Sequence, residues 1–323
     1  MGSGDRRFWP LAAALLATWL LSGCAAWLPQ AQALRERWPT DLAPRVELQQ
    51  VPFFAQREYE CGPASLAMLL AADGVAVTPD DLVGKVYVPA RQGSLQVEML
   101  AAARTHDRVA WKLAPRLEDV LREVAAGTPV IVLQDYGFWP LRFWHYAVIV
   151  GYDRERQEVV LRSGEKKRLV MPWRALEYTW AKSGRWAMLA TAPERIAVTA
   201  TEAGWAAAVA AMERVATRPA SRAAYRSLLA RWPTSLAGRI GMANVAYADG
   251  DLSAAEKVLR MAVAQHGESD VALNNLAQVL ADQGRRDEAL GIVERAIALS
   301  GPFRATAEQT RRQIQARPAA PVR

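Results

Sequence analysis

Residues 56–68 read Gln-Arg-Glu-Tyr-Glu-Cys-Gly-Pro-Ala-Ser-Leu-Ala-Met, and this stretch predicts a thiol at the start of an apolar helix. Pro63 suits the first turn of a helix, because the N–H that proline lacks has no helical partner there. The apolar residues that follow predict a buried helix, which Gly74 ends. The helix dipole and the free N–H groups of the first turn would stabilise a thiolate at Cys61. The stretch therefore indicates a nucleophilic cysteine.

The number of cysteines favours the same interpretation. The chain has two, Cys24 and Cys61. Cys24 follows Leu-Ser-Gly after the apolar stretch 8–20, a pattern that resembles the lipobox of bacterial lipoproteins, in which the cysteine is lipidated and becomes the first mature residue. Cys61 then has no partner for an internal disulfide. A free thiol in an oxidising compartment favours a catalytic role.

The lipobox resemblance also implies a location. The residue after Cys24 is Ala25 rather than aspartate, which in Gram-negative bacteria favours sorting to the outer membrane. We therefore expect residues 1–23 to be a lipoprotein signal peptide, and a lipid anchor on Cys24 to hold the protein at the outer membrane, facing the periplasm. An ordinary cleaved signal or a signal anchor is the alternative. Residues 24–46 hold three prolines without sustained periodicity and are expected to be a tether.

The composition indicates a globular protein of two modest domains. Hydrophobic residues make up 51% of the 323 positions, charged residues make up 23%, and the formal net charge is +7. No run of five basic residues occurs. These features favour a solvated surface with some affinity for anionic lipid, and no nucleic-acid partner is expected. We also expect no metal and no other cofactor.

Residues 47–192 mix helical and extended patterns. Three further helices are expected, one beginning near Thr78, one beginning near Ser94 and one at 116–127. Short β-branched runs predict strands at 129–133, 145–152, 158–162 and 186–190, and the second and third of these are joined through a hairpin turn at 153–157. Helices followed by a sheet predict an α+β domain with two packed layers.

Residues 193–316 are helical, rich in alanine and repeated with a period of 34 residues. Gly250 recurs as Gly284, and small or apolar positions recur around it. This spacing resembles the tetratricopeptide repeat and predicts an all-α solenoid, with a weaker copy at 202–231. A generic alanine-rich bundle is the alternative. Repeats of this family bind peptides or proteins, so a protein partner is expected. Residues 317–323 are expected to be a disordered tail.

A histidine would complete the activation of Cys61, and the chain has three. His106 lies in a polar stretch and His266 lies at the end of a repeat helix, so both are expected at the surface. His145 begins a strongly apolar strand, where a sheet could hold the imidazole rigidly against a helix N-terminus. His145 is therefore the candidate base.

The pattern Gln-x₄-Cys-Gly-Pro-Ala-Ser-Leu-Ala, followed at 145–152 by His-Tyr-Ala-Val-Ile-Val-Gly-Tyr, resembles the bacteriocin-processing family of papain-like cysteine peptidases. These peptidases cleave after double-glycine leaders. The resemblance covers residues 47–192 and implies a papain-like fold, with Cys61 as nucleophile and His145 as general base. It also implies that Gln56 helps to form the oxyanion hole, with the backbone N–H of Cys61 as a second donor.

One departure from the family pattern concerns the residue that orients the histidine. Family members carry an Asp-Pro pair after the second strand, whereas residues 159–164 contain no carboxylate. Asp153 lies eight residues from His145 along a strand, about 26 Å away at 3.3 Å per residue. Antiparallel pairing would bring Ser163 opposite His145, where its oxygen could accept the imidazole N–H. Asp135, at the end of the preceding strand, is the second candidate.

A second departure concerns domain architecture. The sequence has no Gly-x₄-Gly-Lys-Ser/Thr phosphate loop and no internal membrane helices, which excludes leader cleavage coupled to export within one polypeptide. The expected function is a tethered cysteine peptidase that acts on a peptide or protein substrate. A peptidase-fold scaffold or binding lipoprotein is the main alternative, and amide hydrolysis or transamidation on cell-wall peptides is a third. The aromatic loop 136–144 is expected either to line a substrate cleft or to pack in the core.

Overall fold

The computed structural model describes residues 28–138 and 140–316, which form two compact units. The signal peptide, the lipidation site Cys24 and the tail at 317–323 lie outside the described residues. The first unit comprises the residues up to Ala103 with Ala110–Thr191 and Ala197–Thr199. The second comprises Arg104–Val109, Ala192–Ile196 and the residues from Ala200 onward.

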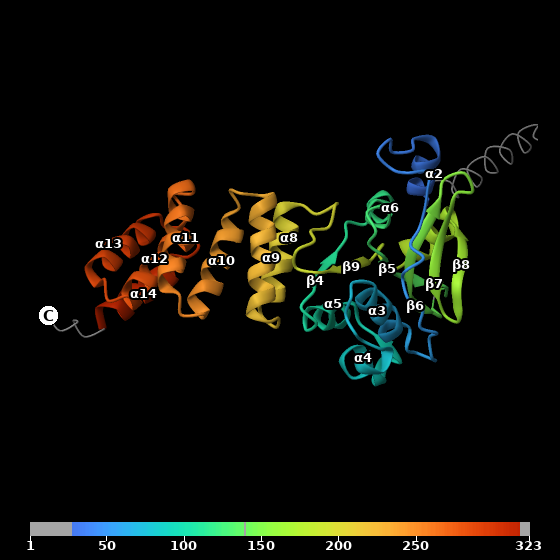
Figure 1. The fold of residues 1–323 in the computed structure, drawn as a ribbon, viewed down its shortest axis with the longest axis horizontal. Coiled ribbons are helices and arrows are strands. Elements are labelled where there is room, and N and C mark those ends of the chain that lie inside the picture. The colour runs from blue at the N-terminus through green and yellow to red at the C-terminus, as the bar shows by residue number, and fades with distance from the viewer. Residues whose placement is uncertain (1–27, 139, 317–323) are drawn as a thin grey trace, which may run out of the picture. The chain divides into compact units, whose positions relative to one another are not determined.

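A seven-stranded sheet forms the centre of the first unit (Figure 1). Its order is β4-β9-β5-β6-β7-β8, and β1 pairs with the far end of β6. The long central strand β6 pairs antiparallel with both β5 and β7. A separate two-stranded sheet joins β2 and β3. The strands are β1 Arg45–Glu47, β2 Tyr87–Val88, β3 Gly93–Ser94, β4 Val109–Lys112, β5 Val130–Asp135, β6 Trp144–Asp153, β7 Glu158–Ser163, β8 Lys166–Pro172 and β9 Ala187–Thr191.

Helix α3, Cys61–Ala72, packs against the sheet and is buried along the run Gly62–Leu70. A helix that is apolar around its whole circumference is stable in a protein core, where all of its faces are buried. The position of α3 meets this requirement. The other helices of this unit are α2 Pro29–Glu36, α4 Pro79–Val86, α5 Gln96–Arg104, α6 Leu117–Ala125 and α7 Trp173–Ala181, with the 3₁₀ turn η1 at Pro89–Arg91. The predicted α+β class is confirmed. The helices α2, α7 and η1 and the strands β1, β2, β3, β4 and β8 were not predicted.

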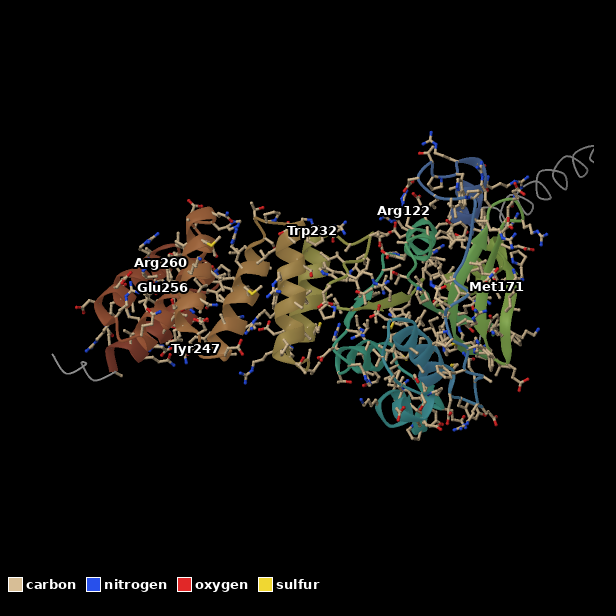
Figure 2. All side chains as sticks on the ribbon, viewed as in Figure 1. Arg122, Met171, Trp232, Tyr247, Glu256 and Arg260 are labelled. Atoms are coloured by element: carbon tan, nitrogen blue, oxygen red, sulfur yellow. The ribbon has the colours of Figure 1, made fainter. Side chains whose placement is uncertain are left out.

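The prediction of a tether over residues 24–46 is wrong from Pro29 onward. Helix α2 docks on the domain because the buried carboxylate of Glu177 accepts the N–H groups of Gln30 (3.1 Å) and Ala31 (2.7 Å). A carboxylate at a helix N-terminus satisfies otherwise unpaired donors. Arg122 of α6, labelled in Figure 2, pairs with Asp41 at 3.1 Å and holds the segment after α2.

The second unit is a run of paired helices whose first members begin at residues 202, 236, 270 and 304, at 34-residue intervals. The predicted period is therefore confirmed and extends through the weaker copy. Turns between paired helices use Gly250 and Gly284, with φ near +80°, a conformation that glycine adopts without strain. The helices are α8 Glu202–Glu213, α9 Arg218–Arg231, α10 Leu236–Ala248, α11 Leu252–Gln265, α12 Asp270–Asp282, α13 Arg286–Ala298 and α14 Arg304–Ala316.

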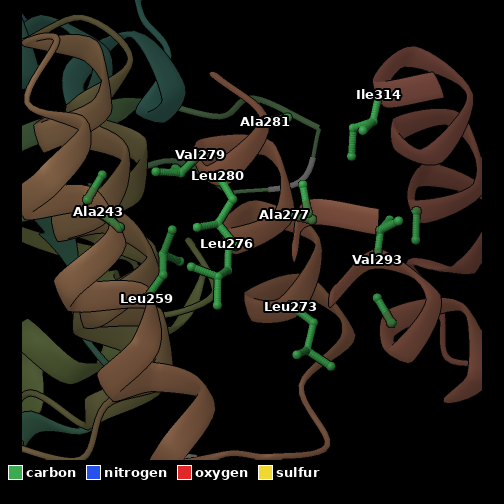
Figure 3. Packing of buried hydrophobic residues seen from close by; sticks show 14 residues of the cluster. Ala243, Leu259, Leu273, Leu276, Ala277, Val279, Leu280, Ala281, Val293 and Ile314 are labelled. Atoms are coloured by element: carbon green, nitrogen blue, oxygen red, sulfur yellow. The ribbon is translucent and has the colours of Figure 1, made fainter. Parts of the chain in front are cut away.

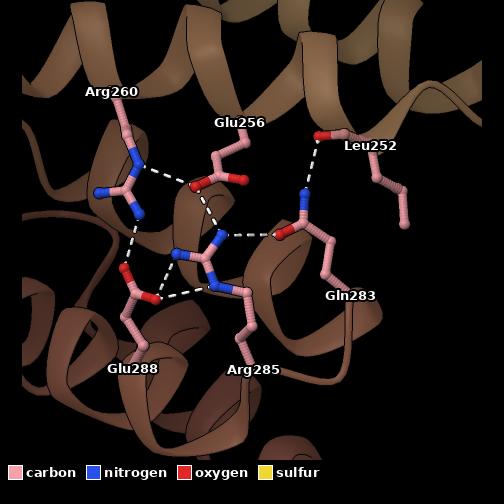
Figure 4. A network of polar contacts seen from close by, with 6 residues as sticks. All are labelled: Leu252, Glu256, Arg260, Gln283, Arg285 and Glu288. Atoms are coloured by element: carbon pink, nitrogen blue, oxygen red, sulfur yellow. Dashed lines mark hydrogen bonds and ion pairs between the residues drawn. The ribbon is translucent and has the colours of Figure 1, made fainter.

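Small and apolar side chains from successive repeats fill the interior of this unit (Figure 3). Ala243, Leu259, Leu276 and Leu280 are each at most 2% exposed. On the surface, Glu256 and Arg260 of α11 pair with Arg285 and Glu288, at the start of α13 (Figure 4). Although partial burial acts to raise it, hydrogen bonds from Arg285 and Arg260 hold the pKa of Glu256 at about 2. Such exposed ion pairs contribute more to the alignment of α11 with α13 than to the free energy of unfolding.

Candidate active site

Cys61 is the first residue of α3, as the sequence predicted. Burial raises the pKa of its thiol, and hydrogen bonds from the backbone N–H groups of Tyr146, Gly62 and Cys61 act in the opposite direction. Tyr146 directly follows His145 in β6, so the nucleophile lies against the strand that carries the candidate base. Glycine is required at position 62, next to Cys61, because a Cβ there would come within 2.2 Å of Ser94 Oγ.

His145 is held by Ser163. The imidazole Nε2 lies 2.8 Å from Ser163 Oγ, and the ring of Tyr136 lies 5.8 Å from the imidazole. Burial lowers the pKa of His145 to about 4, so the imidazole is neutral at physiological pH. Between Cys61 and His145, both of which the structure describes, no direct hydrogen bond is present. The resting site is thus a neutral thiol beside a neutral imidazole.

A β-bulge brings Ser163 onto the same face of the sheet as His145. The register between β6 and β7 shifts by one residue between Ile149 and Gly151. Beyond the bulge Val148 pairs with Arg162, so Ser163 falls diagonally across from His145 on one face. Without the extra residue in β6, the side chain of Ser163 would point to the opposite face.

Gln56 is fixed between three elements. Its Nε2 lies 3.2 Å from Tyr146 O and 3.3 Å from Ser65 Oγ, and its Oε1 accepts the N–H of Gly164 at 2.9 Å. Ser163 and Gly164 therefore hold both His145 and Gln56 from a single β7–β8 turn. Gly164 has φ +59°, which favours glycine there. Both amide hydrogens of Gln56 face protein acceptors, so one must be redirected before Gln56 can bind an oxyanion.

Asp135, the second candidate orienter, lies on the wrong face of the sheet. Gln134 pairs with His145 and Asp135 pairs with Trp144, so the Asp135 side chain points away from the imidazole. Its carboxylate instead pairs with Arg142 at 2.6 Å and accepts the N–H groups of Gly137 and Phe143. Asp135 builds the loop that follows β5.

The loop that Asp135 holds is a hairpin extension with exposed apolar side chains. Tyr136 N–H donates to Phe143 O at 2.9 Å, and Phe138 N–H donates to Leu141 O at 2.8 Å. Phe138 and Leu141 are 67% and 66% exposed, so the loop does not pack in the core. We call residues 136–138 and 140–144 the aromatic hairpin. It adjoins His145 in sequence, and Tyr136 contributes to the burial of the imidazole.

Several residues of the site were not predicted from the sequence. Ser65 and Tyr146 bind Gln56 through a side-chain oxygen and a backbone carbonyl. Gly164 forms the β7–β8 turn, and the ring of Tyr136 packs against the imidazole of His145. Ser65 stands one helical turn after Cys61, so a polar residue in an otherwise apolar helix was the available signal. His266 lies apart from the site, with Nε2 2.7 Å from Thr234 O. Within residues 28–138 and 140–316, no cluster of three or more His, Cys, Asp and Glu side chains could hold a metal ion.

Comparisons with known proteins agree with this fold and this domain order. Residues 48–188 match the model of the Peptidase_C39 like family, and residues 271–300 match a tetratricopeptide repeat model. The chain thus carries a Peptidase_C39-like domain followed by a TPR-like repeat. A C39-like peptidase structure from Bacillus anthracis is 21% identical, with a TM-score of 0.38, and the match covers 45% of this chain and 96% of that one. No curated protein matches the chain. No helix in the described part of the chain is long and apolar enough to cross a membrane.

Replacing Ser163 with aspartate should raise the pKa of His145. A carboxylate within hydrogen-bonding distance favours the imidazolium and raises a histidine pKa by roughly 1 to 3 pH units. An imidazole accepts a proton only when it is neutral, so any activity that depends on His145 as a base should fall as the pH drops through about 4 in the wild type. In Ser163→Asp the same loss should occur at higher pH. An NMR titration of the His145 ring measures the shift directly, and an unmoved pKa would contradict the contact.

Replacing Asp135 with alanine should destabilise the domain by about 3–5 kcal/mol, because a fully buried carboxylate is removed from Arg142 and two backbone donors. Asp135→Asn keeps one acceptor and should cost about 1–3 kcal/mol. Urea unfolding measures both values. Since Asp135 does not face the imidazole, the pH dependence of activity in Asp135→Asn should match the wild type. If Asp135→Asn lost activity at a different acidic pH from the wild type, this shift would show that Asp135 acts on His145.

Proposed function

We propose that this protein is a cysteine peptidase that cleaves peptide bonds through a thioester on Cys61. The position of Cys61 at the N-terminus of α3 carries the proposal, because α3 packs against β6, the strand that presents His145. The imidazole is neutral and held on one nitrogen by Ser163, which leaves the other nitrogen to accept a proton. The Peptidase_C39-like match over the same residues supports the assignment.

The proposed reaction has two halves. His145 takes the thiol proton as the Cys61 sulfur attacks the substrate carbonyl carbon, and the carbonyl oxygen gains negative charge. The N–H of Cys61 and the amide of Gln56 would stabilise that oxygen. The C–N bond breaks, and the amine leaves with the proton from His145. Water, deprotonated by His145, then cleaves the thioester and restores the thiol.

The resting geometry makes substrate binding part of the activation. Cys61 and His145 are not hydrogen-bonded to each other, and burial disfavours the charged form of both. Catalytic hydrogen bonds are often long in ligand-free enzymes and shorten when substrate binds. The aromatic hairpin offers exposed apolar surface next to His145 and is the proposed contact for apolar side chains of the substrate.

We further propose that the chain is a lipoprotein, anchored through Cys24 to the outer membrane and facing the periplasm, and that the repeat helices recruit a protein partner or substrate. The cysteine pattern of the sequence supports the anchor, and the TPR-like repeat supports the recruitment. A second candidate function is a peptidase-fold scaffold. The raised thiol pKa favours that alternative, as does the finding that a serine, and no carboxylate among the described residues, bonds to His145.

A peptide library tests the proposed function. The purified mature chain is incubated with peptides that include double-glycine sequences, and new termini are identified by mass spectrometry. The peptidase proposal predicts defined cleavage sites flanked by apolar residues. An intact library, under conditions where the protein remains folded, would support the scaffold instead.

A further inference from the structure

The first unit has an arginine-lined groove far from the active site. Two adjoining hollows, of about 320 and 540 Å³, share Arg35, Gln157 and Trp173 in their walls. Arg154 lines the first hollow, and Arg156 and Arg174 line the second. We call these four arginines and the surface between them the arginine groove. The helix α2, the 154–157 turn and the start of α7 build it.

The four guanidinium groups have no carboxylate partner among the described residues. Two glutamates also line the groove, Glu36 and Glu155, so its walls carry an excess of positive charge. The adjacent hollow differs, because there Arg168 is paired with Glu47 at 2.9 Å and Arg45 with Asp153 at 3.8 Å. Arg156 lines this hollow as well, but its other two arginines are paired, so the unpaired arginines gather in the groove.

The floor of the groove is rigid. Trp173 is 2% exposed and donates its indole N–H to Glu158 O at 3.0 Å. Its ring stacks on Trp38 at 5.6 Å, and the Arg154 guanidinium lies 5.6 Å from the centre of the Trp38 ring. The surface beneath the arginines is therefore already in place before an anion binds.

The position of the groove along the chain indicates its occupant. Leu28, one of its lining residues, stands four positions after Cys24. Four residues span at most about 14 Å, so an acyl anchor on Cys24 would hold the groove within reach of the lipid headgroups. Basic groups near a membrane attract its anionic lipids. We propose that the arginine groove docks on anionic phospholipid headgroups of the membrane that holds the anchor.

Docking at this groove would point the active site away from the lipid. β6 runs from Trp144, beside His145, to Asp153, beside the arginines of the 154–157 turn. Ten residues of strand place these ends about 30 Å apart. The exposed aromatic hairpin lies at the His145 end and so remains available to substrate.

Vesicle binding by the mature chain with Cys24→Ser, which cannot be acylated, tests this proposal. The protein should bind vesicles of phosphatidylcholine and phosphatidylglycerol but not phosphatidylcholine alone, and salt should release it. Each arginine at an anionic surface contributes roughly fivefold, so Arg35→Gln/Arg156→Gln/Arg174→Gln should weaken binding about 100-fold. The matched control is Arg226→Gln/Arg295→Gln/Arg312→Gln, which removes equal charge from exposed repeat positions and should bind within about twofold of the unsubstituted chain.

Three outcomes would overturn the proposal: equal weakening in the control, binding that ignores phosphatidylglycerol, or release by millimolar inorganic phosphate at constant ionic strength. The last result would assign the groove to free phosphate. Because the three substituted arginines are exposed and unpaired, the variant should fold, and circular dichroism checks this. Cleavage of a soluble peptide should be unchanged in the triple variant, which separates this proposal from the proposed peptidase activity.

Discussion

Cys61→Ala should abolish peptide cleavage, with a fall in kcat/KM of at least about 10⁴-fold. The sulfur is the only atom in the proposed site that forms a covalent bond to the substrate, and alanine cannot replace it. Oxyanion donors and substrate-binding groups remain in the variant, so weak residual acceleration over water is expected. Cleavage by the variant at the wild-type sites and rate would contradict the assignment of Cys61.

The fold should survive this change, which makes the result interpretable. Cys61 occupies the first position of α3 and is not fully buried, whereas the core of the helix begins at Gly62. Alanine suits a helix start, and loss of one thiol should change the free energy of unfolding by about 1 kcal/mol or less. Urea unfolding and the circular dichroism spectrum provide the control.

His145→Ala should lower kcat/KM by about 10²–10⁴-fold, the usual contribution of a positioned general acid and base. The two other histidines, His106 and His266, both belong to the second unit, and the His266 imidazole bonds to Thr234 O. The residual rate should rise with pH, because hydroxide would then have to deprotonate a thiol whose pKa burial raises. A pH profile of the residual cleavage distinguishes this result from unfolding.

Two matched variants sharpen the test of His145. His145→Gln keeps a hydrogen-bonding side chain opposite Ser163 but removes the base, and it should be as inactive as His145→Ala. Ser163→Ala leaves the imidazole in place without its partner and should cost less than either. If His145→Gln retained wild-type activity, the imidazole would not be the base.

Thiol alkylation alone would not separate the peptidase from the scaffold. Free thiols react as thiolates, and burial raises the pKa of Cys61 while the neighbouring imidazole is neutral. Slow alkylation near neutral pH is therefore expected of the resting protein under both proposals. Only turnover, in which substrate binding brings the two groups together, discriminates between them.

Local patterns in the sequence predicted the parts of the fold that depend on local physics. Pro63 and the apolar run after it predicted α3, and the apolar, β-branched run from His145 onward predicted β6. The 34-residue period predicted the solenoid, because each repeat packs mainly on its neighbours. Cys61 lies on α3, His145 lies on β6, and Gln56 lies on the loop before α3.

Long-range contacts decided what the sequence could not predict. Helix α2 buries only Ala31 and Leu34, and its capping carboxylate, Glu177, lies 146 positions away from Ala31. In the sequence alone, such a short and polar stretch resembles a tether, because nothing near it indicates that Glu177 caps a helix there. Ser163 faces His145 because of the register shift between β6 and β7 before Gly151. Asp135 is excluded by a different register, in which Gln134 of β5 pairs with His145. No local pattern in the sequence marks either register.

Trapping of the covalent intermediate is the most direct test of a thioester at Cys61. The mature chain is mixed with a peptide that it cleaves in the library, quenched in acid and digested, and the fragment that contains Cys61 is weighed. The proposed mechanism predicts a mass increase equal to the N-terminal cleavage product minus water, on Cys61 alone. Cleavage with an unmodified Cys61 under all quench times, together with equal cleavage by Cys61→Ala, would contradict it.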